Sequence, residues 1–197
     1  MPLPWPIRDR VLARRAIAAR GGDEAAMRAL YRELYPEIAR YVGRRIRSSA
    51  DAEDLVSRVF FTLVERLDDF DPARGNLRGW LFRIARNAII DHVRKQRPTV
   101  AYDGLGDLLP ADADDPLHEL LERERLGHLL VLLDAEPAET RELLALRYGD
   151  GLRHREIAEM TGISEAAVKQ RVSRAVRDLR SRVTRAIEKG DADVAVG

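Results

Sequence analysis

The sequence predicts an all-α fold in which an acidic linker joins two small helical domains. Apolar residues recur every three or four positions through most of the chain, as they do along one face of a helix. No sustained alternation of apolar and polar residues marks a strand, and neither Asp-Gly pair, at 103–104 or 150–151, stands between two such runs. Residues 98–116 break the helical pattern with five aspartates, two glycines, three prolines and no basic residue. This composition is typical of a linker.

The composition of the 197-residue chain restricts its class. Its residues are 45% hydrophobic and 34% charged, which indicates a folded chain. The absence of cysteine excludes disulfides and thiolate zinc sites and fits a reducing, cytoplasmic setting. The longest apolar run, residues 129–133, is far shorter than the roughly 20 residues that a membrane-spanning helix needs. We therefore expect no insertion into a membrane, and residues 1–20 lack the features of a secretion signal.

Composition and helical periodicity divide the chain into five segments. We predict an N-terminal extension, a first helical domain, the acidic linker, a second helical domain and a tail, at residues 1–22, 23–97, 98–116, 117–187 and 188–197. The arginine-rich residues 8–20 are compatible with a short additional helix. Two basic segments, residues 74–97 and 153–185, fall one in each domain, on either side of the acidic linker.

Three helices are expected in the first domain. The first covers residues 25–47 as one helix or a broken pair, the second begins after a cap at Ser49 or Asp51, and the third runs from a cap at Asn76 to Gln96. The connection before Asn76 must then be a loop. The apolar positions expected to face the core are Leu30, Leu34, Ile38 and Val42 in the first helix, Val56, Phe60, Leu63, Val64 and Leu67 in the second, and Leu81, Ile84, Ala85, Ala88, Ile89 and Val93 in the third.

The third helix and the loop before it combine basic and aromatic residues. Residues 74–97 hold seven basic residues and one acid, together with Trp80 and Phe82, and Phe70 lies just upstream. Aromatic rings that stack on unpaired bases, beside cations that hold phosphates, are what a single-stranded nucleic-acid site needs. Each residue also has a purely structural interpretation. It places Phe70 and Phe82 in the core and makes Asn76 an ordinary helix cap, while Trp80 fits either role equally well.

The second domain is expected to begin with two helices. Residues 117–133 predict a helix with an unusually broad apolar face. Pro137 fits the first turn of another helix, which would end near residues 148–149.

Residues 154–179 have the layout of a helix-turn-helix, with Gly162 ending the first helix and Ser164 capping the second. At 100° per residue, one side of the second helix is apolar and the opposite side is polar and basic. Arg and Gln side chains in such a row can reach base edges in a major groove. The alternative is a helical hairpin with a merely solvated outer face, but the short turn and the excess of bases favour DNA binding. The apolar side comprises Val168, Val172, Val176 and Leu179, and the opposite side comprises Gln170, Ser173, Arg174 and Arg177, with Lys169 and Arg171 on the flanks.

Three stretches of the sequence, taken in their order along the chain, together resemble a known protein family. The first is Asp51-Ala52-Glu53-Asp54-Leu55-Val56 followed by Val59-Phe60. The second extends from Phe70-Asp71-Pro72 through Gly79-Trp80-Leu81-Phe82-Arg83-Ile84-Ala85-Arg86-Asn87 to Asp91. The third covers residues 143–179 and includes Gly151-Leu152, Glu156-Ile157-Ala158 and Val168-Lys169. Together they resemble the bacterial sigma factors of the extracytoplasmic-function (ECF) type, a compact group of the sigma-70 family that keeps only regions 2 and 4.

The resemblance implies that the first domain recognises and melts the minus-10 promoter element and that the second reads the minus-35 element. It implies that both domains dock on core RNA polymerase, through the beta-prime clamp helices and the beta flap respectively. It also implies an anti-sigma factor as a further partner, no active site and no cofactor. By position, the polymerase-binding residues are Asp51, Glu53, Asp54 and Leu55. The minus-10 residues are Asn76, Arg78, Trp80, Arg83 and Asn87, and the minus-35 residues are Arg153, Lys169, Gln170, Arg171 and Arg174.

The chain departs from the family pattern on the polymerase-binding helix. Ser57-Arg58 stands where the family usually has Gln followed by an acid, and Val64 stands where Trp is common. These departures point to an atypical polymerase-facing surface. The acidic linker carries a separate expectation: before polymerase binds, its aspartates would cover the basic faces and lower the affinity of the free protein for DNA.

Two other classes of function are alternatives at this point. One is an autonomous helix-turn-helix transcription regulator, in which residues 1–97 sense a signal or form a dimer. The other is an enzyme that uses Asp91 and His92. The second is weakly supported, because the pair lacks a cysteine, a third ligand and a nearby nucleophile.

Overall fold

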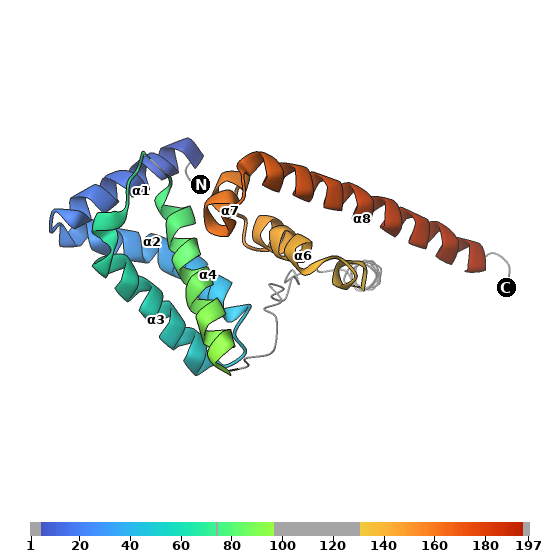
Figure 1. The fold of residues 1–197 in the computed structure, drawn as a ribbon, viewed down its shortest axis with the longest axis horizontal. Coiled ribbons are helices and arrows are strands. Elements are labelled where there is room, and N and C mark those ends of the chain that lie inside the picture. The colour runs from blue at the N-terminus through green and yellow to red at the C-terminus, as the bar shows by residue number, and fades with distance from the viewer. Residues whose placement is uncertain (1–4, 74, 97–130, 195–197) are drawn as a thin grey trace, which may run out of the picture.

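The computed structural model describes residues 5–73, 75–96 and 131–194, and the regular structure within these residues is helical throughout. Figure 1 shows two groups of helices, α1 to α4 and α6 to α8, with α7 beside α4 and α8 extending away from the first group. The predicted all-α fold with two helical domains is confirmed. The elements are α1 (Trp5–Arg20), α2 (Glu24–Gly43), α3 (Ser49–Glu65), the 3₁₀ turn η1 (Leu67–Asp69), α4 (Leu77–Gln96), α6 (Ala138–Leu144), the π turn η2 (Ala145–Gly149), α7 (His154–Thr161) and α8 (Glu165–Val194).

Helix α2 forms the centre of the first bundle. Its N-cap is Asp23, whose carboxylate accepts hydrogen bonds from the backbone N–H groups of Ala25 and Ala26. The four apolar residues expected at every fourth position are all buried, so the predicted inward face of this helix is confirmed. They are Leu30, Leu34, Ile38 and Val42.

Helix α3 corrects two expectations. Its cap is Ser48, whose Oγ accepts a hydrogen bond from the Asp51 N–H at 3.2 Å, and not Ser49 or Asp51. Ser48 wins because its extended backbone lets its side chain turn back to the third helical residue. Val64 is 58% exposed, although we expected it in the core. The buried stripe through Val56, Phe60, Leu63 and Leu67 leaves Val64 on a side of the helix that none of the described helices covers.

Helix α4 starts as predicted. The Asn76 side chain accepts a hydrogen bond from the Gly79 N–H at 2.8 Å, which makes Asn76 its cap. Leu81, Ala85 and Ile89 are fully buried along one face. Phe70 and Phe82 also lie in the core, as the structural interpretation predicted: they are 3% and 1% exposed.

The additional arginine-rich helix is present as α1. Leu12 and Ala16 turn into the first bundle and are buried. Arg8 donates to Glu33 of α2 at 2.9 Å, and Arg20 donates to the carbonyl of Leu67 at 2.9 Å. Arginines of α1 therefore bind both a carboxylate of α2 and a backbone carbonyl of the turn η1, which follows α3.

Glu37 is the carboxylate that ties three helices of this bundle together. It accepts from Arg8 of α1 and, at 2.6 Å, from Arg78 of α4. Burial alone would raise the pKa of Glu37, but the ion pairs with Arg78 and Arg8 outweigh it and hold the pKa below the ordinary value of 4.5. The folded state therefore binds the proton more weakly than the unfolded state. The stability that this group contributes is present above its ordinary pKa and is lost as the pH falls through the lowered one.

Replacing Glu37 with glutamine is expected to lower the free energy of unfolding by about 2 kcal/mol at neutral pH, since a largely buried carboxylate leaves two arginines underpaired. The difference from the parent protein should shrink well below pH 4.5, where the parent carboxylate is itself protonated. Urea unfolding, followed by circular dichroism at neutral pH and at about pH 3, measures the difference in the free energy of unfolding between the variant and the parent. Glu24→Gln, an exposed acid of the same helix, is the matched control and should change little. A loss that stays constant down to about pH 3 would contradict the pairing argument.

The second bundle contains the expected helix-turn-helix. Gly162 ends α7 with a left-handed backbone, φ +78°, which glycine adopts without strain. The Ala167 N–H donates to the Ser164 Oγ at 3.2 Å, so the predicted cap of the second helix is confirmed. Val168, Val172 and Leu179 are buried as expected. The helix itself continues to Val194, far beyond the predicted motif.

The helix predicted after Pro137 changes its winding before it ends. Regular α-helix stops at Leu144, and a π turn follows to Gly149, closed by a hydrogen bond from the Asp150 N–H to the Ala145 carbonyl at 2.9 Å. Gly151 then has φ +65°. The wide turn places Asp150 beside Arg44 and Arg45, which follow α2.

Several expectations fall on residues outside the described ranges. These are the acidic linker at 98–116, nearly all of the helix expected at 117–133, and both ends of the chain. Among the helices that the structure does describe, none has the length and apolarity to cross a membrane.

Candidate nucleic-acid and polymerase interfaces

Three of the five predicted minus-10 residues share one face of α4. Trp80, Arg83 and Asn87 are spaced by three and four positions, so their side chains leave the helix on the same side. Arg83 and Asn87 are exposed, and Trp80 is half-buried because its ring leans on Phe70, with ring centroids 5.8 Å apart at 45°. Their role at the minus-10 element stays a prediction from the resemblance. The sequence left open whether Trp80 packs in the core or is accessible, and the structure shows that it does both.

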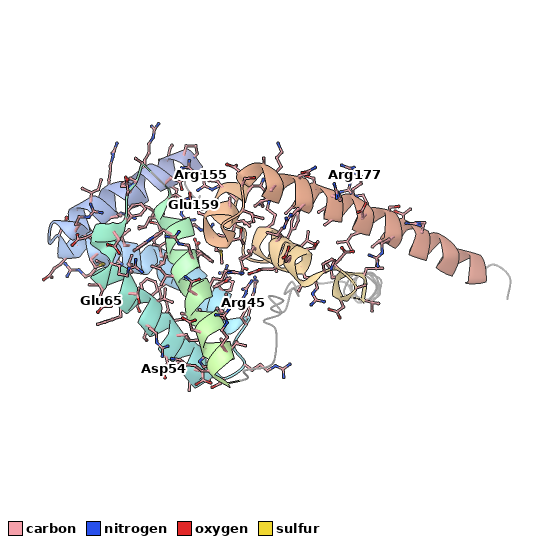
Figure 2. All side chains as sticks on the ribbon, in the orientation of Figure 1. Arg45, Asp54, Glu65, Arg155, Glu159 and Arg177 are labelled. Atoms are coloured by element: carbon pink, nitrogen blue, oxygen red, sulfur yellow. The ribbon has the colours of Figure 1, made fainter. Side chains whose placement is uncertain are left out.

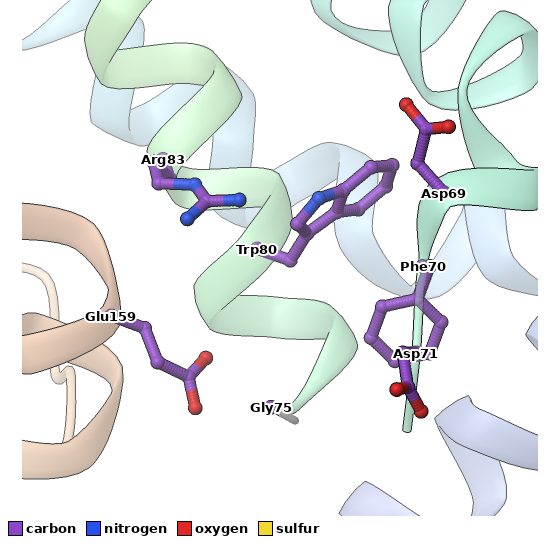
Figure 3. Close-up of a pocket in the computed structure, with 7 residues that line it drawn as sticks. All are labelled: Asp69, Phe70, Asp71, Gly75, Trp80, Arg83 and Glu159. Carbon is purple, nitrogen blue, oxygen red and sulfur yellow. The ribbon is translucent and has the colours of Figure 1, made fainter. Parts of the chain in front are cut away.

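A pocket of about 340 Å³ opens beside Trp80 (Figure 3). Trp80 and Arg83 come from α4, while Phe70 and its neighbours come from the loop that precedes it. Glu159 reaches toward this loop from α7, on the opposite side. The pocket therefore combines an aromatic surface, an exposed guanidinium and a carboxylate from the second bundle. The residues that line it are Asp69, Phe70, Asp71, Gly75, Trp80, Arg83 and Glu159.

The other two predicted minus-10 residues, Asn76 and Arg78, are covered. They are 7% and 4% exposed. Arg78 donates to Glu37 at 2.6 Å and, from a second nitrogen, to Glu156 of α7 at 2.7 Å. Its guanidinium also stands over the ring of Phe82, 4.9 Å from the centroid. In this arrangement Arg78 joins the two bundles and does not face solvent.

Glu159 lies against the loop that begins α4. The backbone N–H and side-chain amide of Asn76 approach its carboxylate at 3.4 to 3.5 Å, and Arg155 of α7 approaches it at 3.4 Å. Burial raises the pKa of Glu159, and the contacts with Asn76 and Arg155 lower it by less. A Cβ on Gly79 would stand 2.6 Å from the Glu159 Oε2, so a glycine allows this close approach. Figure 2 shows Arg155 and Glu159 at the junction of the bundles.

Four of the five predicted minus-35 residues form one exposed basic surface on α8. Lys169, Gln170, Arg171 and Arg174 all reach solvent, and Arg171 makes only an exposed ion pair with Glu139 at 3.2 Å. Arg153 lies apart from them. It precedes α7 and pairs with Asp9 of α1 at 2.7 Å and with Glu156 at 3.0 Å.

The predicted polymerase-binding residues start α3. Glu53 and Asp54 are exposed, Asp51 is half-buried, and Leu55 is 1% exposed, so the Leu55 side chain serves the core. Figure 2 shows Asp54 and Glu65 on α3, away from the second bundle.

Sequence reasoning missed an apolar patch beside these acids. Phe61 and Val64 of α3 are 64% and 58% exposed, and Tyr31 and Tyr35 of α2 stand next to Phe60 with ring centroids 4.8 and 5.9 Å away. The helical angle of Val64, outside the stripe of its neighbours, was the signal that could have found this patch.

The enzyme alternative gains no support from the geometry. His92 Nε2 lies 3.8 Å from a carboxylate oxygen of Asp51, across the end of two helices. In the part of the chain that the structure describes, no three His, Asp or Glu side chains gather in a way that could hold a metal ion.

Two family models match the chain: Sigma-70 region 2 over residues 30–99 and Sigma-70, region 4 over residues 129–179. The ECF RNA polymerase sigma factor RpoE of Cereibacter sphaeroides is 30% identical over 163 residues, which cover 82% of this chain and 88% of that protein. The chain belongs to the ECF sigma factors. Another ECF sigma factor, SigL of Mycobacterium tuberculosis, is 32% identical over 168 residues, with 84% of this chain and 93% of SigL covered.

The fold of this sigma factor also matches a solved one. CnrH, whose structure was determined in complex with the cytosolic domain of CnrY, is 28% identical, with a TM-score of 0.58 over 89% of this chain and 97% of CnrH. The resemblance read from the sequence is thus confirmed, and the chain is an RNA polymerase sigma factor. An autonomous regulator with a sensing or dimerisation domain is not favoured, because residues 30–99 match region 2 of sigma factors.

Proposed function

We propose that the first bundle captures and opens the minus-10 element while the second bundle reads the minus-35 element. The observation that carries the proposal is the single face of α4 with Trp80, Arg83 and Asn87 beside an aromatic-walled pocket. Stacking on an aromatic ring is worth about 1–3 kcal/mol per unpaired base. A base that leaves the duplex exposes its whole edge, so capture in such a pocket joins melting to sequence recognition.

Opening the duplex requires a partner. Stacking in DNA is worth about 1.4 kcal/mol per base-pair step, so a few steps exceed what one small helical bundle supplies through phosphate contacts. The sigma factor therefore acts as a specificity subunit of core RNA polymerase and needs no active site or cofactor of its own. Its place of action is then the cytoplasm, where transcription occurs.

We assign the docking surface for the beta-prime clamp helices to α3. Glu53 and Asp54 supply charge there, and the exposed Phe61 and Val64 supply apolar area, which matches the apolar core and polar rim of protein interfaces. Leu55 contributes by packing the helix onto α2 and α4. The second bundle docks on the beta flap by resemblance.

An anti-sigma factor is the further partner we propose. The relative CnrH binds the cytosolic domain of CnrY, and most of this chain superimposes on CnrH. The exposed apolar residues of α2 and α3 offer one surface for such a protein.

Transcription from core RNA polymerase supplied with this chain alone tests the proposal. Genomic fragments of the host serve as templates, and sequencing of the transcript 5′ ends locates any promoter. We expect initiation at a small set of sites that share two elements, because only a sigma factor gives initiation without another specificity subunit. DNA binding without any initiation would contradict the proposal and favour the autonomous regulator.

Arg174→Ala is expected to weaken recognition of the minus-35 element. Arg174 is exposed on the basic surface of α8, and a good bidentate contact to a base is worth about 1–3 kcal/mol of discrimination, or about 5- to 150-fold. Binding of the holoenzyme to a promoter and to the same promoter with a scrambled minus-35 element measures the effect. Arg185→Ala, three turns further along α8, is the matched control. If both variants lose affinity equally and without regard to sequence, Arg174 contacts only phosphates.

A further inference from the structure

We propose that the second bundle covers the start of α4, at Asn76 and Arg78, as an anionic substitute for DNA, so that nucleic acid must displace it to reach these two predicted minus-10 residues. The proposal deepens the function proposed above and rests on it, because it takes the start of α4 to be the minus-10 site. Its basis is a set of four carboxylates of the second bundle, here called the interface carboxylates, that face the first bundle. They are Glu142, Asp150, Glu156 and Glu159.

Each of the first three interface carboxylates pairs with an arginine of the first bundle. Glu142 holds Arg86 of α4 through two hydrogen bonds, at 2.6 and 3.0 Å. Asp150 holds Arg45 at 2.7 Å, with side chains that are only 3% and 2% exposed. Arginine binds phosphate groups through the same kind of short, charge-assisted hydrogen bonds. These carboxylates therefore take up the arginines as phosphates would.

The pair between Glu156 and Arg78 reaches the predicted site itself. Its distance is 2.7 Å, and the two side chains are 0% and 5% exposed. The third nitrogen, Nη2, donates to the Asp150 carbonyl at 3.3 Å, so every guanidinium nitrogen of Arg78 has a protein acceptor and none is directed at a phosphate while α7 stays in place. One pair has the reverse polarity, Arg153 with Asp9, so the second bundle is held by charges of both signs.

The Glu159 carboxylate lies against the loop that precedes α4, where a phosphate group could also bind. It faces the backbone N–H and side-chain amide of Asn76 at the first turn of α4, where helix N–H groups favour an anion. It also lines the pocket beside Trp80 and stands against Gly79. A nucleic-acid strand entering this pocket would bring its phosphates close to the Glu159 carboxylate, and like charges repel.

The sequence led us to expect such masking from the aspartates of the linker, which lie outside the described residues. The described contacts assign the same role to the second bundle. The basic surface of α8 stays exposed in this arrangement, so the masking applies to the start of α4 and not to Lys169, Gln170, Arg171 and Arg174. The free protein would then bind duplex minus-35 DNA readily and single-stranded minus-10 DNA poorly.

The test neutralises three interface carboxylates without changing their shape: Glu142→Gln, Asp150→Asn and Glu159→Gln together. Glu156 is left intact because it also accepts the hydrogen bond that caps α7. The control carries the same change of charge at three exposed acids outside the interface, Glu24→Gln, Glu65→Gln and Asp178→Asn.

Two measurements on the full chain separate movement from binding. The chain has no native cysteine, so Ser57→Cys on α3 and Ser181→Cys on α8, both exposed, accept labels that report the distance between the bundles. The chain has two tryptophans, so Trp5→Phe leaves Trp80 as the only one, and its fluorescence reports stacking by bases. The probe is a random-sequence single-stranded DNA 12-mer.

We expect the interface variant to lengthen the distance between the labels and to bind the 12-mer about tenfold more tightly than parent and control. The apparent Kd equals the intrinsic Kd divided by the fraction of open molecules, so fully opening a protein that is about one-tenth open lowers the apparent Kd about tenfold. Two results would overturn this inference and leave the proposed function intact. The first is an unchanged distance between the labels in the interface variant. The second is a longer distance with no change in affinity for the 12-mer, as read by Trp80 fluorescence. Quenching of Trp80 in none of the proteins, even with the labels apart, would overturn the proposed minus-10 site as well.

Discussion

Replacing Trp80 with alanine is expected to lower transcription by the holoenzyme about 10- to 100-fold, with the loss in the melting step. The indole both stacks on Phe70 and forms a wall of the pocket, so its removal takes away the platform for an unpaired base, worth about 1–3 kcal/mol. Permanganate reactivity of thymines in the promoter measures melting directly. Binding of the holoenzyme to the closed promoter should fall much less, because the minus-35 contacts of α8 are untouched.

Trp80→Phe is the control for this experiment. A phenyl ring retains a stacking surface and the contact with Phe70, so most of the melting activity should return. Thermal unfolding of both variants verifies that the first bundle remains folded. A Trp80→Ala holoenzyme that melts the promoter as fully as the parent would remove Trp80 from the minus-10 site.

Replacing Glu156 with alanine is expected to lower the free energy of unfolding by about 2 kcal/mol, because the variant loses both the pair with Arg78 and the side chain that accepts at the start of α7. Without Glu156, Arg78 keeps Glu37 as its one carboxylate partner. The Arg78 side chain is only 5% exposed, so water does not readily replace the lost partner. It also removes the side chain that accepts from the Arg153 N–H at the start of α7. Urea unfolding followed by helical circular dichroism gives the difference.

Glu139, an acid at the first turn of α6, provides the control for Glu156. Its side chain is 84% exposed and pairs only with the exposed Arg171, so Glu139→Ala should change the free energy of unfolding by at most about 1 kcal/mol. Equal losses in the two variants would mean that burial of the Arg78–Glu156 pair has no energetic weight.

Periodicity and capping chemistry predicted most of the helices. Gly162 and Ser164 punctuate the helix-turn-helix as expected, since a left-handed glycine and a capping hydroxyl act within one turn of the backbone. The same local rules failed at the start of α3, where the sequence offered Ser49 or Asp51 as the cap and the structure uses Ser48. They failed also at Val64, because an apolar residue says nothing about whether another helix covers it.

The resemblance assigned residues to the candidate sites, but it did not indicate which of them are accessible. Trp80, Arg83 and Asn87 share a face because a helix repeats every 3.6 residues, whatever it packs against. The exposure of Arg78 depends on a residue 78 positions away along the chain, Glu156. No local pattern encodes such a pair.

The sequence by itself determined that this protein is helical, that it carries two basic modules, and that it belongs with the ECF sigma factors. Only the tertiary structure decided that the acids of the second module neutralise the arginines of the first, and that an apolar patch remains uncovered on α2 and α3. The physical reason is range: hydrogen bonds within a helix join residues a few positions apart, whereas ion pairs and burial join whatever the packing of helices brings together.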